Sequence, residues 1–183
     1  MKVIDNKVSK SLQNKIEKYL LQTNFPWYYE AKSLAKWVPK KFKIETKDSF
    51  DNFQFFHKFV ENSKINSSHT NIIMDLLDEL DMGGIPILRC KANLKFKTQT
   101  NKKHNVFHID NSSPHKVMIY YVNNSDGDTF LKIGKSTKKI SPKKGRVLCF
   151  DGSIMHAANH PRKTNKRLII NFNVLWKLKV VWK

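Results

Sequence analysis

Apolar residues in the first part of the chain recur at the spacing of helices. The stretch VSKSLQNKIEKYLLQ repeats Leu, Ile and Tyr every three or four residues, behind Ser9 or Ser11 as the N-cap. A second stretch, SSHTNIIMDLLDELDMGG, has the same period, a preceding serine cap, and Gly83 or Gly84 at its end. Residues 1–84 are therefore expected to be mainly helical and to support the rest of the fold.

From Ile85 onward the hydrophobic period changes to two. IPILRCKANLKFK alternates apolar and polar residues, with Arg89, Lys91, Asn93 and Lys95 on the polar face. Further strands are predicted in KVMIYYVN, DTFLKI, GRVLCFD and KRLIINFNVLW, separated by turn sequences such as NNSDGD. This order predicts an α+β, mainly β fold, in which helices brace an antiparallel double-sheet jelly roll over residues 85–175.

Composition favours one folded domain over residues 1–183. The chain is 40% hydrophobic and 11% aromatic, enough to bury a core without cross-links. Cys90 and Cys149 each lie in a short apolar run and are expected to be buried, reduced thiols. There is no apolar leader and no apolar span of 18 residues, so a cytoplasmic protein with no membrane association is expected.

The charge is strongly positive. The chain has 34 basic and 15 acidic residues, a net charge of +19, which attracts nucleic acid, ribosomes, acidic peptides or carboxylate cosubstrates. Only four of the basic residues are arginine, and Asn, Ile and Phe are abundant, as an AT-rich coding bias would produce. A role in binding and a coding bias both remain open.

The stretch HNVFHID carries the first candidate chemistry. On an extended strand, His108 and Asp110 project to the same face about 6.6 Å apart, within reach of one ion. A third ligand must come from elsewhere, and CFDGSIMHAANH supplies His156. Two histidines and one aspartate form the facial arrangement that leaves open positions on Fe(II). Arg167 opens the last long strand and can hold a carboxylate through two hydrogen bonds.

Each of these assignments has an alternative. His160 competes with His156 as third ligand, but its HPRK context reads as an exposed loop. Arg162 and Lys166 compete with Arg167, although Lys166 points to the opposite face of the strand. The same period places Asn171 and Asn173 beside Arg167, where they either border the pocket or lie on an edge strand.

This ordered set resembles the His-x-Asp…His…Arg pattern of Fe(II)/2-oxoglutarate-dependent dioxygenases. HKVMIYYVNNSDGDTFL and KKGRVLCFDGSIMHAANHPRKTNKRLIINFN are similar to two segments of the prolyl 4-hydroxylase-like members, including compact ones from phages and marine bacteria. The resemblance covers about residues 85–175 and is weak before them. One departure is the turn Asp126–Thr129, which reads DGDT rather than the Gly-Gly-Glu-Thr-like sequence of the family.

The resemblance implies a double-stranded β-helix, or cupin-like jelly roll, and a set of site residues. His108, Asp110 and His156 would bind Fe(II). The far carboxylate of 2-oxoglutarate would pair with Arg167, and the Tyr121 hydroxyl would be a second contact. O2 would be the other cosubstrate, with ascorbate as a supporting reductant.

Three further assignments at this site are less constrained. Tyr121 rather than Tyr120 follows from its place in YYVN, and a core aromatic is the alternative. Asn93 either faces the cosubstrate from the preceding strand or lies on a solvated sheet face. Asn171 is expected to contact the cosubstrate if its strand face borders the pocket.

The function expected from the resemblance is hydroxylation of a prolyl residue in a protein or peptide, for example in the translation machinery, with 2-oxoglutarate converted to succinate. The same chemistry on a methylated nucleic-acid base or on a free amino acid is an alternative, as is a non-catalytic jelly-roll binding module. Substrate contacts are expected in residues 24–37 and 95–106.

Overall fold

The computed structural model describes residues 1–31, 53–99 and 103–175 of the chain. A large antiparallel sheet has the order β1-β9-β6-β11-β5-β3-β2, with β4 paired to β3. Its strands are β1 (Lys2–Ile4), β2 (Tyr28–Glu30), β3 (Gln54–Glu61), β4 (Lys64–Ile65), β5 (Ile87–Phe96), β6 (Lys116–Tyr121), β9 (Val147–Asp151) and β11 (Lys166–Val174). A small sheet has the order β10-β7-β8, formed by β7 (Thr129–Ile133), β8 (Ser136–Ile140) and β10 (His156–Ala158).

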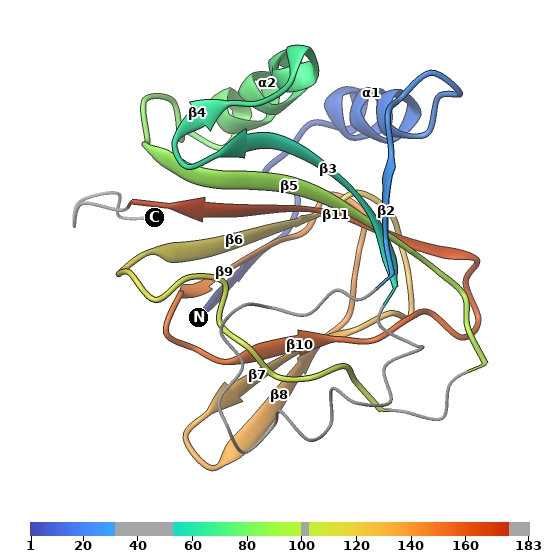
Figure 1. Ribbon diagram of the computed structural model, residues 1–183, viewed down its shortest axis with the longest axis vertical. Coiled ribbons are helices and arrows are strands. Elements are labelled where there is room, and N and C mark those ends of the chain that lie inside the picture. The colour runs from blue at the N-terminus through green and yellow to red at the C-terminus, as the bar shows by residue number, and fades with distance from the viewer. Residues whose placement is uncertain (32–52, 100–102, 176–183) are drawn as a thin grey trace.

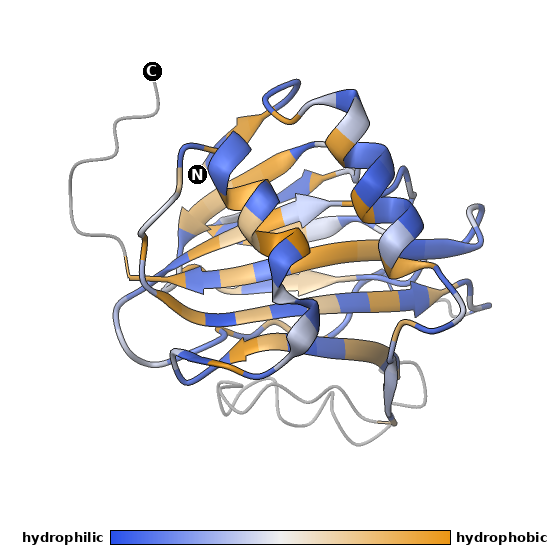
Figure 2. Cartoon of the chain, turned by 90° about the horizontal axis from the view of Figure 1, so that it is seen from above, coloured by the Kyte–Doolittle hydropathy of each residue, from blue (hydrophilic) through white to orange (hydrophobic). Residues whose placement is uncertain are grey.

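Helices α1 (Lys10–Leu20) and α2 (Asn71–Glu79) lie on one side of the large sheet, and the small sheet lies on the other (Figure 1). Seen from above, both helices cross the same face of the large sheet and carry hydrophilic and hydrophobic residues along their length (Figure 2). The predicted architecture, two facing sheets braced by helices, is confirmed.

Local sequence explains where the helices begin. The Ser9 hydroxyl accepts a hydrogen bond of 3.2 Å from the Leu12 backbone N–H and caps α1, as predicted. Before α2, Ser67 caps a short 3-10 helix (Ser68–Thr70) instead, and α2 continues from it without a side-chain cap of its own. None of the helices in the described ranges reaches the length and apolarity of a membrane span.

The alternation in β5 separates two environments. Cys90, Ala92 and Leu94 pack against the apolar faces of α1 and α2 in the main core. Cys90 and Cys149 are buried and free, as predicted. The polar side chains of β5 point to the opposite side, into the space between the two sheets. A second apolar cluster, which includes Ile119, Leu131 and Ile169, packs the two sheets together beside that space.

Residues 1–84 were predicted to be mainly helical, but they also contribute four strands, β1 to β4, to the large sheet. β3 pairs with β5, and β1 pairs with β9. The register between β3 and β5 shifts between Lys58 and Val60, so the apolar residues of QFFHKFVE do not alternate regularly. The three-residue β1 is too short to show any period. Both strands are defined by partners far away in the sequence.

Candidate functional site

The space between the sheets is a cavity of about 480 Å³, a size suited to a small ligand. Its floor is the shared face of β5 and β11, where residues from the two strands lie opposite one another. In order along the strands, these pairs are Arg89–Asn173, Lys91–Asn171, Asn93–Ile169 and Lys95–Arg167.

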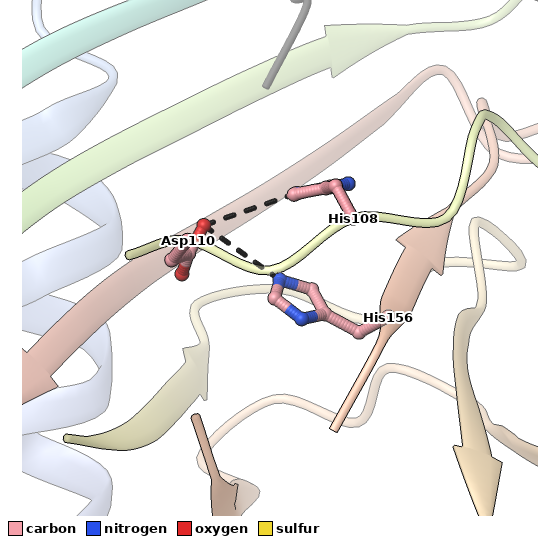
Figure 3. A group of neighbouring side chains, drawn as sticks. All are labelled: His108, Asp110 and His156. Carbon is pink, nitrogen blue, oxygen red and sulfur yellow. Dashed lines mark ion pairs between the residues drawn. The ribbon is translucent and has the colours of Figure 1, made fainter. Parts of the chain in front are cut away.

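Backbone pairing brings His108 and His156 together. The His108 N–H donates to the His156 carbonyl at 3.0 Å, and the His156 N–H donates to the His108 carbonyl at 2.9 Å. His156 follows His108 by 48 positions, and β6 to β9 lie between them, so this contact joins the loop that carries HID to the edge of the small sheet. Figure 3 shows the three side chains of His108, Asp110 and His156 pointing toward one another.

The two imidazoles present the same nitrogen to Asp110. Nδ1 of His108 lies 3.1 Å from the Val106 carbonyl, and Nδ1 of His156 lies 3.3 Å from the Ile154 carbonyl. Because a carbonyl only accepts, Nδ1 carries the proton and the lone pair is on Nε2. Burial and then the neighbouring His156 lower the pKa of His108 to about 4, so this ring is neutral at neutral pH. Neutral imidazole is the form that binds metals.

Asp110 is held from the floor of the cavity. Its Oδ2 accepts hydrogen bonds from the side-chain amides of Asn171 (3.0 Å) and Asn173 (2.9 Å). Its Oδ1 lies 3.8 Å from His108 Nε2 and 3.7 Å from His156 Nε2. Burial alone would raise the pKa of Asp110, but the positive charge of Arg89 and the nearby His156 hold this pKa well below its usual range. The carboxylate is therefore ionised at neutral pH.

These three side chains fit a metal ion. One ligand atom from each lies within 4.8 Å of the others, as no other group of three or more His, Cys, Asp or Glu side chains does in the described part of the chain. An ion about 2.1 Å from each of two ligands spans a separation of up to about 4.2 Å, and both Oδ1–Nε2 distances lie within that limit. Two nitrogens and one oxygen suit Fe(II), with open positions left for other ligands.

Arg89 competes for the same oxygen. Its Nη2 lies 2.8 Å from Asp110 Oδ1, the atom that faces both imidazoles. A divalent ion on Oδ1 would lie within a few ångströms of this guanidinium, and like charges at that range repel strongly in a partly buried site. Arg89 thus balances the negative charge of Asp110 when no metal is bound. It would also weaken the binding of a metal ion to Asp110 Oδ1.

We therefore expect Arg89→Gln to bind Mn²⁺ or Ni²⁺ about tenfold more tightly than the wild type, a gain of about 1.4 kcal/mol. Isothermal calorimetry would measure it. Lys58→Gln is the matched control, since Lys58 lines the same cavity but pairs with Glu61 instead. Weaker metal binding by Arg89→Gln would mean that Arg89 supports the geometry of Asp110 and does not oppose the ion.

The other end of the floor is built around Arg167, whose side chain is buried. Its Nε donates to the Gly127 carbonyl at 2.6 Å, and its Nη2 donates to Thr129 Oγ1 at 2.9 Å. A Cβ at Gly127 would lie 2.7 Å from Arg167 Cδ, so this turn has to be glycine for the arginine to occupy its place. The Tyr121 hydroxyl donates to the same Thr129 oxygen at 2.8 Å. Burial lowers the pKa of Arg167, yet arginine stays protonated at neutral pH.

The structure distinguishes between several of the alternatives. His156 joins the cluster, whereas His160 hydrogen-bonds to the Phe96 carbonyl. His160 is buried, so its prediction as an exposed loop residue was wrong. Arg162 is exposed before β11 and does not line the cavity, whereas Arg167 does.

The structure also shows where the asparagines and Tyr121 lie relative to the cavity. Asn93 is buried in the cavity lining, so the expectation of a solvated sheet face was wrong, because the small sheet covers this face. Asn171 also lines the cavity, but its amide nitrogen bonds to Asp110. β11 is a central strand, so an edge position for Asn171 and Asn173 is excluded. Tyr121 is a core residue whose hydroxyl reaches Thr129.

Sequence reasoning missed Thr129 and Arg89 among the residues of the cavity, and it placed Lys95 only at the start of a segment expected to contact substrate. Thr129 appeared only as part of a turn. Arg89 was assigned to the polar face of β5, and only the alternation with Asn93 linked it to the site. Of the two segments expected to contact substrate, Glu30, Lys95, Asn105 and Val106 line the cavity. Residues 32–37 and 100–102 lie outside the described residues.

No protein-family model and no curated protein matches this chain. Solved structures do match. A 2OG-Fe(II) oxygenase family oxidoreductase from Burkholderia pseudomallei has a TM-score of 0.67 at 17% identity, over 94% of this chain and 83% of the other. A prolyl hydroxylase from Trichoplax adhaerens, in complex with a hypoxia inducible factor peptide fragment, has a TM-score of 0.64 at 14% identity, over 95% and 82%.

A third match is HygX from Streptomyces hygroscopicus, solved with nickel and 2-oxoglutarate bound. Its TM-score is 0.57 at 11% identity, over 99% of this chain and 84% of the other. Of these three structures, one is thus a 2OG-Fe(II) oxygenase family member, one is a prolyl hydroxylase, and one binds 2-oxoglutarate and nickel. The resemblance and the fold predicted from the sequence are confirmed, and at these identities the likeness is one of fold.

Proposed function

We propose that this protein is an Fe(II)- and 2-oxoglutarate-dependent hydroxylase. The observation that carries the proposal is the placement of two complementary sites in one cavity. The cluster of His108, Asp110 and His156 lies at one end, and Arg167 lies at the other. One end suits a divalent ion and the other a carboxylate, which matches a cosubstrate that chelates the metal and carries a second carboxylate.

The residues have distinct tasks in this proposal. His108, Asp110 and His156 hold Fe(II), and the Asn171 and Asn173 amides fix the orientation of Asp110. Arg167 binds the far carboxylate of 2-oxoglutarate, and Thr129, supported by Tyr121, holds the guanidinium in place. Fe(II), 2-oxoglutarate and O2 supply the oxidative chemistry, with ascorbate as a supporting reductant. The protein positions them and excludes water.

For the substrate we propose a prolyl residue in a protein or peptide, which would include targets in the translation machinery. Support comes from the resemblance of two sequence segments to prolyl 4-hydroxylase-like members and from the peptide-bound Trichoplax neighbour. We place the reaction in the cytoplasm, within a single domain.

A second candidate is a small charged substrate such as a free amino acid. The cavity is also lined by two acidic and two basic residues, and charges of both signs suit an ammonium and a carboxylate group. These residues are Glu30, Glu61, Lys58 and Lys91. A third substrate class to be tested is a methylated nucleic-acid base, because the net charge of +19 favours binding of nucleic acid.

The experiment is a substrate panel on the Fe(II)-loaded protein, with succinate release and product mass as readouts. Proline-containing peptides, free amino acids and methylated oligonucleotides would be compared. If the protein is a hydroxylase, one class of substrate should stimulate the release of succinate, and that substrate should gain the mass of one oxygen atom. Loss of a methyl group from an oligonucleotide would replace the prolyl assignment. If no 2-oxoglutarate is bound or consumed, the protein is a jelly-roll binding module.

A further inference from the structure

A second positive charge lies beside Arg167 at the carboxylate end of the cavity. Lys95 on β5 is the cross-strand partner of Arg167 on β11, and both side chains line the cavity. Both residues are almost completely buried, with exposed fractions of 5% for Lys95 and 2% for Arg167. Burial of two adjacent like charges is unfavourable unless an anion compensates for them.

The described part of the chain does not supply that anion. Arg167 donates to two uncharged oxygens, those of Gly127 and Thr129. Asp128 is close enough to favour the charge on Arg167, but its carboxylate lies 3.5 Å from Lys139. No described carboxylate lies within ion-pair distance of Lys95.

The next carboxylate along the cavity is already engaged. Glu30 on β2 lies 3.8 Å from Lys91 and accepts a hydrogen bond of 2.5 Å from Gln54 on β3. Gln54 in turn accepts from Asn93 at 2.9 Å. This chain of contacts keeps Glu30 on the Lys91 side of the floor, so the positive charge of Lys95 and Arg167 is directed at the cavity.

We propose that Lys95 is a second positioning residue for the far carboxylate of 2-oxoglutarate, acting together with Arg167. This inference rests on the proposed function. It means that a residue of β5 contributes to the selectivity of the protein for its cosubstrate. Two cations at one end of the cavity favour a 2-oxo acid with a second carboxylate over a monocarboxylic 2-oxo acid such as pyruvate.

If Lys95 has this role, its amine should take up a proton when the cosubstrate binds, and this uptake can be measured. Burial, then Arg167, then Lys91 lower the pKa of Lys95 to about 7, while Glu30 acts in the opposite direction. At about pH 8 the amine of the cosubstrate-free protein is therefore mostly neutral. A carboxylate placed next to it would raise this pKa, so binding would take up a proton.

Calorimetry tests this directly. 2-Oxoglutarate would be titrated into Ni²⁺-loaded protein at about pH 8, in two buffers of different ionisation enthalpy. For the wild type we expect uptake of a large part of one proton. Lys95→Met should show no such uptake and bind about tenfold or more weakly. Lys95→Arg should retain most of the affinity without taking up a proton, because arginine is already charged.

Two controls separate this role from a structural one. Lys95→Met replaces a buried ionisable amine beside Arg167 with an apolar side chain, so its melting temperature without cosubstrate should equal or exceed that of the wild type. Lys58→Met removes a cavity lysine that does not affect Lys95, and it should leave proton uptake unchanged. Pyruvate binding should differ little between the wild type and Lys95→Met.

The outcomes are distinguishable. Wild-type protein that fails to bind 2-oxoglutarate would overturn the proposed function itself. Wild-type binding with equal affinity and equal proton uptake in Lys95→Met would overturn the role of Lys95 and leave the proposed function standing.

Discussion

Loss of metal binding is the expected result of replacing His156 with alanine. The change removes one of three ligands and leaves two from the same loop, so we expect the affinity for Ni²⁺ or Mn²⁺ to fall by more than about 100-fold. The protein should still fold, because His156 is joined to His108 through backbone hydrogen bonds that do not need the imidazole. Calorimetry measures the affinity, and circular dichroism checks the fold.

His160→Ala is the matched control, since His160 is the other histidine of the same segment. Its ring bonds to the Phe96 carbonyl and lies outside the cluster. We expect lower stability but unchanged metal affinity in this variant. The reverse pattern, with metal lost in His160→Ala and retained in His156→Ala, would show that the cluster is not the metal site.

The second large effect is expected for Arg167→Met. Charge-assisted hydrogen bonds contribute about 1.5–3 kcal/mol each, so loss of a two-pronged contact should weaken 2-oxoglutarate binding by about 100-fold or more. Metal affinity should not change, because Arg167 lies at the opposite end of the cavity from Asp110. Titration of 2-oxoglutarate into Ni²⁺-loaded protein gives the first quantity, and metal titration gives the second.

Two further variants sharpen this prediction. Arg167→Lys keeps the charge but loses the planar pair of donors, so its affinity should lie between those of the wild type and Arg167→Met. Arg162→Met removes an exposed arginine just before β11 and should bind 2-oxoglutarate normally. Equal weakening in Arg162→Met and Arg167→Met would mean that net charge, and not the Arg167 contact, controls binding.

The cluster could be predicted from the sequence because the types of its residues and their spacing along the chain indicate metal ligands. His108 and Asp110 are two residues apart on an extended backbone. His156 follows a strand that the hydrophobic period identifies, and Arg167 lies near the start of another. That period also predicted β5, β6, β7, β9 and β11, but it did not predict the short strands β8 and β10. The pairing of His108 with His156 follows only from how the strands are ordered in space.

The rest of the site could not be predicted because it depends on which side of a strand is covered. The polar residues of β5 have the pattern of a solvated sheet face, and nothing local to β5 shows that the small sheet lies above them. Arg89 therefore looked like a surface charge. Strands β1 and β3 were missed for a related reason, since each is held in place by a partner more than 25 residues away.

The most direct test of the central claim is an anaerobic titration of Fe(II) and 2-oxoglutarate, followed by visible absorption. A 2-oxo acid chelated to Fe(II) gives a weak charge-transfer band. We predict this band for the wild type, its absence in His156→Ala, and a requirement for more 2-oxoglutarate in Arg167→Met. Folded wild-type protein that shows no band at saturating Fe(II) and 2-oxoglutarate would contradict the assignment of this cavity as an iron and 2-oxoglutarate site.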